Sequence, residues 1–405
     1  MPQSPVCRIG STIRYKYRLV SSADSRRAHW RIGGKGRGNM ATMEDQIKQI
    51  DEELRKTAYN KKSQRHIGKL KAKLAHLSEE TERRRSSKGK GSGYSVRKSG
   101  NASVAIVGFP SVGKSTLLNK ITKAKSEVGA YDFTTLDVVP GLLEHRGAKI
   151  QVLDLPGIIK DASKGRGRGR EVISVVRTAD MILLMIDVFE TNIKVLTDEL
   201  EAAGIRLNTR PPDVQVIKRT KGGIDVNSTV KLTKLDEDLV EDMIREFGIN
   251  NADVVIREDV DEDRLVDALA TNRHYVKAFV AINKIDLVTK AYLNEIEKRL
   301  KKWVIVPVSA ETGLNVDLIK DKIFDTLDLI RLYLKPQGQE ADMKDPLVVR
   351  KGTDVGGVCD ALHRDFRRKF RYALVWGKSA KFPGQIVGLE HVLEDEDIIS
   401  IIVKR

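Results

Sequence analysis

Apolar positions along the chain repeat with two different periods. Two stripes at helical spacing, centred on Ile50 and Leu70, predict a helical hairpin over residues 43–85. Residues 86–100 are rich in Gly, Ser and Lys, which is typical of a flexible linker. The first part of the chain therefore predicts a helical unit that is separate from the rest of the protein.

Beyond residue 100, short apolar runs alternate with helix-like stretches. The runs that predict buried strands are Ser103–Val107, Ile150–Leu155, Met181–Val188, Ala278–Asn283 and Val304–Val308. Helices are expected at Lys114–Thr122 and Val316–Leu332. Strands that alternate with helices favour an α/β fold with a doubly wound, mainly parallel sheet.

The domain boundaries follow from these patterns. The roughly 90 residues between Val188 and Ala278 exceed a minimal α/β unit, and a Gly-Gly turn and an acidic helix predict an inserted α+β subdomain. A small mixed unit follows Pro336. The expected division is an extension at 1–42, the hairpin at 43–85, a linker at 86–100, the doubly wound domain at 101–188 and 278–336, the insert at 189–277, and a C-terminal domain at 340–405.

Composition narrows the class of protein. Among 405 residues only Cys7 and Cys359 are cysteines, which excludes a disulfide framework and an all-cysteine zinc site and favours a reducing cytoplasm. No apolar run approaches the roughly 18 residues that a membrane span needs. We therefore expect no membrane partner. Residues 1–42 could be a misassigned start, since Met40 and Met43 directly precede the first patterned segment.

The net charge of +16 is concentrated before residue 101. Residues 1–39 carry nine Lys or Arg and one acidic residue, and residues 55–100 carry fifteen and three. Residues 40–54 carry a net charge of −4, and residues 101–405 sum to zero. This asymmetry predicts a polyanionic partner, most simply RNA, and a merely solubilising arm is the alternative.

The segment 108–115, Gly-Phe-Pro-Ser-Val-Gly-Lys-Ser, follows a predicted strand and opens a predicted helix. Its glycines allow backbone N–H groups to surround phosphate oxygens, Lys114 can reach the β- and γ-phosphates, and the Ser115 hydroxyl can bind Mg²⁺. The residues predicted to bind phosphate are Gly108, Phe109, Pro110, Ser111, Val112, Gly113, Lys114, Ser115 and Thr116.

A second motif, Asn283-Lys284-Ile285-Asp286, ends an apolar strand where a nucleotide base would lie in such a fold. The carboxylate of Asp286 can accept from guanine N1–H and the 2-amino group, and adenine lacks this pair of donors. Asn283 is expected to tie this loop to the phosphate loop. Ser309-Ala310, after the next strand, could supply a backbone donor to guanine O6.

Two switch segments lie between these motifs. Asp154-Leu155-Pro156-Gly157 ends a strand, so that Asp154 could hold Mg²⁺ through water and the Gly157 N–H could contact the γ-phosphate. Thr135 is preferred to Thr134 as the threonine that completes the magnesium shell. The expected metal set is Ser115, Thr135 and Asp154, and the expected catalytic set is Lys114, Thr135 and Gly157.

These elements in this order resemble a GTPase of the translation-factor-related class. The phosphate loop, Tyr131–Leu136 with Pro140-Gly141 after it, and Asp154–Ile158 resemble the Obg group. With the insert and the basic hairpin, residues 43–405 resemble the archaeal and eukaryotic developmentally regulated GTP-binding proteins. Leu347–Val403 is similar to a TGS domain, a β-grasp fold, and the resemblance implies contact with RNA, the ribosome or another protein.

One departure concerns hydrolysis. Ile158 stands where Ras-like enzymes carry the glutamine that orients the attacking water, and a hydrocarbon side chain cannot do this. The resemblance implies that K⁺ could assist instead, but Ser111 replaces the asparagine that related cation-dependent enzymes use. We therefore expect slow hydrolysis without a partner.

The sequence thus predicts a cytoplasmic, Mg²⁺-dependent GTPase that acts as a slow switch on ribosomes or RNA, with a protein regulator as a further partner. The alternative is an RNA-binding assembly or scaffold factor in which GTP is mainly structural. RNA or ribosome affinity that differs between the GTP and GDP states would separate the two.

Overall fold

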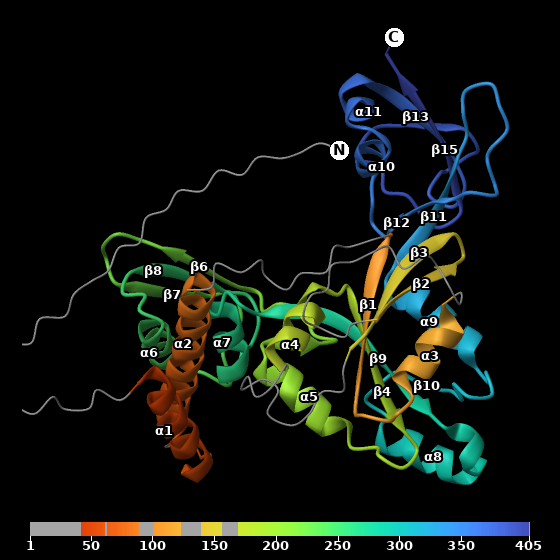
Figure 1. Cartoon of the computed structure of the whole chain (residues 1–405). Coiled ribbons are helices and arrows are strands. Elements are labelled where there is room, and N and C mark those ends of the chain that lie inside the picture. The colour runs from red at the N-terminus through yellow and green to blue at the C-terminus, as the bar shows by residue number, and fades with distance from the viewer. Residues whose placement is uncertain (1–41, 61–62, 89–99, 123–138, 156–168, 405) are drawn as a thin grey trace, which may run out of the picture.

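A computed structural model describes residues 42–60, 63–88, 100–122, 139–155 and 169–404. Three units are visible in Figure 1: a central sheet flanked by helices, a lobe that contains the N-terminal hairpin, and a C-terminal unit. Among the helices in these ranges, none has the length and apolar character needed to cross a membrane.

The main sheet has the strand order β10-β9-β4-β1-β3-β2, and β5 pairs with β9. All its pairings are parallel except that of β2 with β3. Every residue of β1 and β4 is buried, as expected for parallel strands with both faces covered. The strands are β1 Ala102–Gly108, β2 Val139–His145, β3 Ala148–Asp154, β4 Met181–Asp187, β5 Ile205–Leu207, β9 His274–Asn283 and β10 Ile305–Pro307.

Helices cover both faces of the main sheet. One hydrophobic core joins the sheet to α3 (Lys114–Ile121) and α9 (Val316–Thr326). The other joins it to α4 (Gly169–Thr178), α5 (Ile193–Ala202) and α8 (Lys290–Arg299). This two-sided packing confirms the predicted doubly wound fold, and it brings the carboxyl ends of the parallel strands to one edge.

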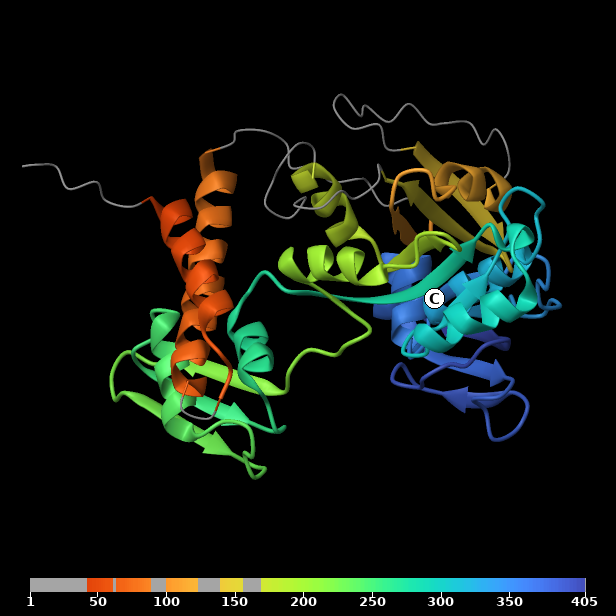
Figure 2. The same ribbon diagram turned by 90° about the horizontal axis from the view of Figure 1, so that it is seen from below.

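The hairpin and the insert form one lobe, residues 42–60, 63–88 and 208–273, which we call the hairpin–insert lobe. Its helices are α1 Met43–Lys56, α2 Gln64–Lys88, α6 Glu237–Glu246 and α7 Glu262–Leu269, and its sheet has the order β6-β8-β7 with β6 Val214–Lys218, β7 Ile224–Ser228 and β8 Ala252–Ile256. Ala72 of α2 is fully buried in the same core as Met243 of α6. Figure 2 shows β9 running from the lobe into the main sheet.

The C-terminal unit is a sheet of order β12-β11-β15-β13-β14 with two helices on one face. Its elements are β11 Leu329–Leu334, β12 Leu347–Arg350, α10 Val355–Leu362, α11 Arg364–Lys369, β13 Phe370–Trp376, β14 Gln385–Val387 and β15 Asp397–Val403. Val348 packs into the core of the main sheet, and Arg350 forms an ion pair with Asp180 at 2.6 Å. These contacts fix the unit at the end of the sheet opposite Gly108.

Two sequence expectations are corrected. The predicted helix Val316–Leu332 ends at Thr326, and Leu329–Leu334 forms β11 of the C-terminal sheet, so that this unit begins before residue 340. The insert does not begin at residue 189, because α5 and β5 belong to the core and sheet of the main unit. At Leu329–Leu334 an apolar run was compatible with helix and strand, and pairing with β12 and β15 decided for the strand. At residue 189 the boundary was misplaced because α5 and β5 complete the main sheet before the chain leaves it.

Candidate functional site

The loop between β1 and α3 has the backbone of a phosphate-binding loop. Ser111 and Gly113 have φ angles of 63° and 93°, which curl the chain just before Lys114 opens the helix. A Cβ atom on Gly113 would lie 2.4 Å from Asn283 Nδ2, so only glycine fits between the loop and the following motif. Backbone N–H groups at such a helix N-terminus favour anions.

The Lys114 side chain is held inside this loop. Its Nζ donates to the Phe109 carbonyl at 2.8 Å and to the Gly108 carbonyl at 3.3 Å. Burial lowers the pKa of Lys114, and the nearby Asp154 carboxylate only partly opposes this. A phosphate beside Nζ would stabilise the charged form, so this ammonium group is placed for an anionic ligand.

Two of the three predicted magnesium ligands meet beside Lys114. The Ser115 hydroxyl donates to the Asp154 carboxylate, and Asp154 is only 7% exposed. The second carboxylate oxygen, Oδ1, is buried and has no hydrogen-bond partner among the described residues. The Ser115 hydroxyl and the Asp154 carboxylate are oxygen ligands of the kind that Mg²⁺ prefers, and the buried Oδ1 is an acceptor that such a cation would satisfy.

Asn283 forms the predicted link between the two motifs. Its Nδ2 donates to the Val112 carbonyl at 2.8 Å, and its Oδ1 accepts from the Ala310 N–H at 2.9 Å. The side chain is 3% exposed, so both its polar groups are satisfied within the protein. The contact with the phosphate loop is therefore confirmed.

The segment predicted to recognise the base contains a contact that the sequence analysis missed. Lys284 Nζ forms an ion pair with Asp187 at 2.6 Å and lies 5.9 Å from the centre of the Phe189 ring, which is 68% exposed. Burial opposes ionisation of Asp187, but Lys284 and two backbone N–H groups outweigh it and hold the pKa of Asp187 below its usual value. An acidic residue at the end of the apolar run Met181–Val188 was the available signal.

Of the other groups predicted to contact the base, Asp286 is accessible and the backbone N–H groups of Ser309 and Ala310 are not. Asp286 lies exposed in the 3-10 helix η1 (Ile285–Leu287), where its carboxylate can accept from a ligand. The N–H of Ser309 donates to the Leu314 carbonyl, and that of Ala310 to Asn283. Both groups are thus engaged within the protein, which leaves neither available to guanine O6 in this arrangement.

Several predicted site residues contribute in other ways or lie outside the structure. Val112 and Leu155 are buried in the two cores of the main unit, so only their backbones can face a ligand. Thr135, Pro156 and Gly157 lie outside the described residues, as does Ile158. Their predicted roles stay predictions.

Residues 103–219 match the family of 50S ribosome-binding GTPases, residues 221–329 match the C-terminal region of that domain, and residues 330–403 match the TGS domain. An uncharacterized GTP-binding protein of Methanocaldococcus jannaschii is 54% identical over 91% of this chain and 95% of its own length. Human developmentally-regulated GTP-binding protein 2 is 43% identical over 89% of this chain and 99% of its own.

This chain belongs to the developmentally regulated GTP-binding protein family. It is a GTP-binding protein with a GTPase domain and a TGS domain, as the sequence predicted. Among solved structures, the YchF GTPase of Schizosaccharomyces pombe is similar with a TM-score of 0.43 and 16% identity, over 76% of this chain and 99% of that one.

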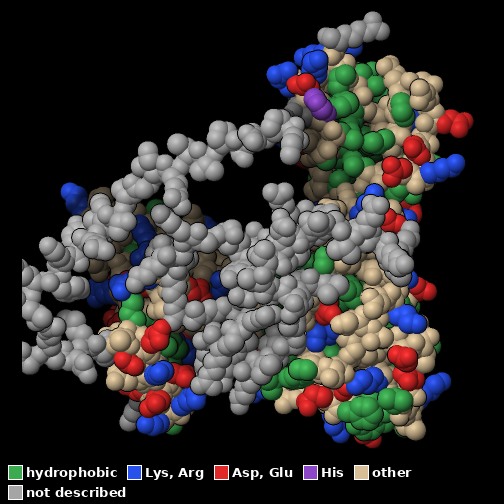
Figure 3. All heavy atoms as spheres, in the orientation of Figure 1, with side chains coloured by type: hydrophobic (Ala, Val, Ile, Leu, Met, Phe, Trp, Pro, Cys, Tyr) green, Lys and Arg blue, Asp and Glu red, His purple; other side chains and the backbone are tan. Residues whose placement is uncertain are grey.

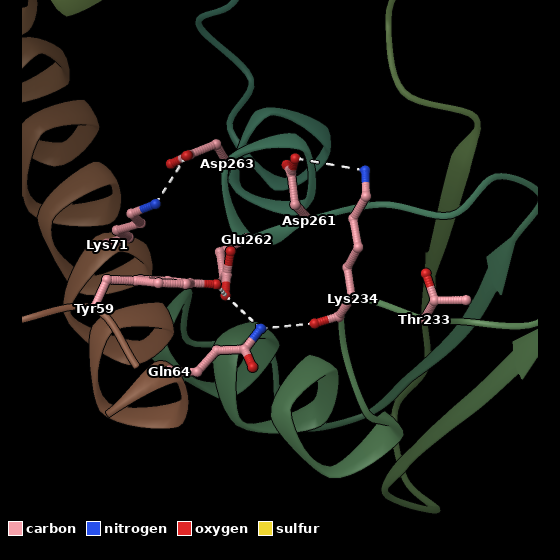
Figure 4. A pocket seen from close by; sticks show the side chains of 8 residues that line it. All are labelled: Tyr59, Gln64, Lys71, Thr233, Lys234, Asp261, Glu262 and Asp263. Carbon is pink, nitrogen blue, oxygen red and sulfur yellow. Dashed lines mark hydrogen bonds and ion pairs between the residues drawn. The ribbon is translucent and has the colours of Figure 1, made fainter. Parts of the chain in front are cut away.

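A separate polar pocket lies between the hairpin and the insert, away from the phosphate loop (Figure 4). Tyr59 and Gln64 of the hairpin both donate to the Glu262 carboxylate, at 3.1 and 2.8 Å. Lys71 pairs with Asp263 at 2.8 Å. The polar groups of these side chains are paired with one another across the interface, so they hold the hairpin against the insert.

Proposed function

We propose that this GTPase uses Mg²⁺, hydrolyses GTP slowly without a partner, and acts as a nucleotide-controlled switch on ribosomes or another RNA. The proposal rests chiefly on the meeting of Ser115 and Asp154 beside the buried Lys114, at the N-terminus of α3. Phosphates bound here would accept from the loop N–H groups and from Lys114.

The metal would be held by Ser115 directly, by Asp154, and by Thr135 from the first switch. Its chemistry would be to neutralise charge on the β- and γ-phosphates. The buried Oδ1 of Asp154, without a partner in the described chain, is the group that such a cation would satisfy.

The base would be selected by Asp286, whose exposed carboxylate is free to accept from the guanine N1–H and amino groups. The ion pair of Lys284 with Asp187 fixes the start of this segment, where Lys284 has a φ of 65°. The Phe189 ring lies over the Lys284 ammonium and is exposed enough to contact a ligand. The backbone donor to guanine O6 would require Ala310 N–H to leave Asn283.

Slow hydrolysis follows from the residue after Gly157. Ile158 cannot orient water, so unassisted turnover should resemble that of Ras, roughly 10⁻⁴ to 10⁻³ s⁻¹. A partner protein, K⁺ or the ribosome would then supply the missing function. A comparison of turnover in K⁺ and in Na⁺ tests whether K⁺ assists, with Ser111 at the position of the cation ligand.

The RNA partner is supported by the basic residues 55–100 and by the family description of residues 103–219 as a ribosome-binding GTPase. The charge is not uniform, because Lys and Arg lie among Asp and Glu on the visible side of the hairpin–insert lobe (Figure 3). The RNA-binding surface would therefore be smaller than the net charge of the hairpin suggests.

Co-sedimentation with ribosomes tests the whole proposal. The protein is loaded with a non-hydrolysable GTP analogue or with GDP, each with Mg²⁺ or with EDTA. We expect tighter ribosome binding with the analogue and Mg²⁺ than in the other three states. Equal binding in all four states would contradict the switch and leave the scaffold function, and wild-type protein that binds neither ribosomes nor RNA would contradict both.

A further inference from the structure

The hairpin–insert lobe is attached to the main unit by one strong, buried contact. The chain passes between the two parts after β5 and again before β9, and these strands pair with each other. At this joint Arg206 of β5 donates through Nε and Nη2 to both carboxylate oxygens of Asp267 on α7, at 2.6 and 2.7 Å. Asp267 is buried, and a bidentate pair of this kind is strong and directional. It is therefore the fixed point of the joint.

The last turns of α2 make a second and weaker contact. Glu82 accepts from Asn272 Nδ2 at 3.0 Å, and its other carboxylate oxygen lies 3.6 Å from Arg177 Nη2 of α4. One turn earlier, Glu79 accepts from the Thr271 hydroxyl. One carboxylate thus connects the hairpin, the joint and the main unit, and we call its contacts with Asn272 and Arg177 the Glu82 bridge. Because Glu82 is half exposed, breaking this bridge costs little.

Arg177 lies near the end of α4 and also contacts the turn between α5 and β5. Its Nη2 donates to the Ala203 carbonyl at 2.5 Å, and a Cβ atom on Gly204 would lie 3.6 Å from the same nitrogen. Its Nε is buried and has no hydrogen-bond partner among the described residues. A buried donor without an acceptor is unfavourable, so Arg177 loses little when it leaves this position.

The position of α4 connects the Glu82 bridge with the nucleotide. α4 is the first described element after the predicted second switch, Asp154–Gly157. Contact of the Gly157 N–H with a γ-phosphate would draw that segment toward the phosphate loop. Figure 1 shows α4 on the side of the main unit that faces the lobe. A shift of α4 toward the phosphates would therefore move Arg177 away from Glu82.

From these contacts we propose that the Glu82 bridge responds to the nucleotide: it holds the hairpin against α4 when GDP is bound and opens when GTP is bound. The pair of Arg206 with Asp267 does not involve α4 and stays closed, so the lobe turns about the joint and remains attached. The inference rests on the proposed switch function. It names the contact through which the nucleotide changes the position of the basic hairpin.

Coupling of this kind is reciprocal, which makes it measurable at the nucleotide site. If GTP opens the Glu82 bridge, loss of the bridge must favour GTP over GDP. An exposed ion pair contributes little free energy, so the change in preference should be about 1.5- to 5-fold. A bridge that only stiffens the joint would leave the preference unchanged.

The first test measures the affinity of the full-length protein for a non-hydrolysable GTP analogue and for GDP, both with Mg²⁺. Glu82→Gln should raise the preference for the analogue by about 1.5- to 5-fold. Glu80→Gln is the matched control, because Glu80 is paired with Arg84 of the same helix at 2.7 Å, and it should keep the wild-type preference. Adding Arg177→Gln to Glu82→Gln should change the preference no further, since both substitutions break the same contact.

The second test follows hydrogen exchange in the last turns of α2. In the wild type these amides should exchange faster with the GTP analogue than with GDP, because the open bridge no longer holds the end of the helix. In Glu82→Gln they should exchange equally fast with either nucleotide, and in Glu80→Gln they should behave as in the wild type. Thermal unfolding of each variant verifies that the fold is intact.

Three results would overturn the inference and leave the proposed function standing. They are equal exchange of α2 in both nucleotide states of the wild type, a nucleotide preference of Glu82→Gln that is unchanged or shifted toward GDP, and additive effects of the Glu82 and Arg177 substitutions. Equal ribosome binding of the wild type in all nucleotide states contradicts the proposed switch itself, whatever the variants show.

Discussion

The phosphate loop and the hairpin–insert lobe differ in how their charges are used. In the loop, one ammonium group, Lys114, lies buried against backbone carbonyls and has no paired carboxylate among the described residues. In the lobe, Lys69 and Lys71 are ion-paired with Asp242 and Asp263 of the insert. A buried cation without a paired carboxylate is thus a candidate ligand group, whereas part of the basic charge of the hairpin holds two segments of the chain together.

The largest expected effect comes from Lys114→Ala. Loss of the ammonium group removes two charge-assisted hydrogen bonds to phosphate, worth about 1.5–3 kcal/mol each. GTP affinity, measured by titration with a fluorescent analogue, should fall accordingly. Lys120→Ala, on the exposed side of the same helix, is the matched control and should bind GTP like the wild type. Nearly unchanged affinity in Lys114→Ala would contradict the assignment of the phosphate site.

The next effect concerns the base. Asp286→Asn should weaken GTP binding by about 1.5–3 kcal/mol and shift preference toward xanthine nucleotides, whose 2-oxo group accepts where guanine donates. Competition titrations with GTP, XTP and ATP measure the shift, and Glu295→Gln on α8 serves as a control. Equal affinity of the wild type for ATP and GTP would refute base selection by Asp286.

Much of the phosphate loop could be predicted because its chemistry is local in sequence. Ser111, Gly113 and Lys114 lie within four positions, and their spacing fixes the turn and the helix start. The contact of Asn283 with Val112 was also predictable, because each motif ends a strand at the same edge of the sheet. The ion pair of Lys284 with Asp187 was missed, since nothing in one strand end indicates which cation lies beside it.

The lobe and the C-terminal unit were less predictable for the same physical reason. Lys71 is paired with Asp263, which lies 192 residues further along the chain. The sequence therefore shows the net charge of the hairpin but does not show which carboxylates its lysines contact. Leu329–Leu334 continued an apolar helical pattern, and its pairing with β12 and β15 made it a strand. Patterns predict the type of an element where local rules dominate, and they fail where distant partners decide.

The interface between the hairpin and the insert should be sensitive to substitution of Gly68, which lies on α2 and faces α6. A Cβ atom there would lie 3.0 Å from Leu239 Cδ1 and 3.2 Å from Met243 Sδ, so Gly68→Leu should overpack the interface and destabilise the lobe by about 1–3 kcal/mol. Urea unfolding measures the loss. Lys73→Leu at an exposed position of the same helix should change stability little. Equal stability of both variants would mean that α2 is not held against α6.

A smaller effect should appear as pH dependence at Asp242. Burial opposes its ionisation, but hydrogen bonds from Lys69 and Arg65 outweigh it and hold the pKa of Asp242 below its usual value. A carboxylate with a depressed folded pKa stabilises the fold above its unfolded pKa, near 4, and loses this as pH falls through the folded pKa.

Asp242→Asn should therefore lower the thermal midpoint at pH 7, and the difference from the wild type should vanish in strong acid. Asp238→Asn, one turn earlier, is the matched control because Asp238 is 78% exposed and 3.9 Å from Arg65. A deficit of Asp242→Asn that persists unchanged to the lowest pH would show that packing, and not the ion pair, is lost.

The smallest effect compares two lysines of α2 that are four residues apart. Lys69 is paired with Asp242 at 3.0 Å, whereas Lys73 is exposed and has no carboxylate partner within the described chain. If the hairpin contributes to RNA binding, Lys73→Glu should weaken it for all sequences and reduce the slope of log affinity against log salt by about 0.7 or more. Lys69→Glu should destabilise the lobe and change that slope less, because its charge is already compensated. Filter binding over a salt series measures both slopes, with GTP affinity as the check on the main unit. Equal reductions of the slope in both variants would contradict the distinction between paired and unpaired cations, whereas slopes unchanged from the wild type in both would show that this surface of the hairpin does not bind RNA.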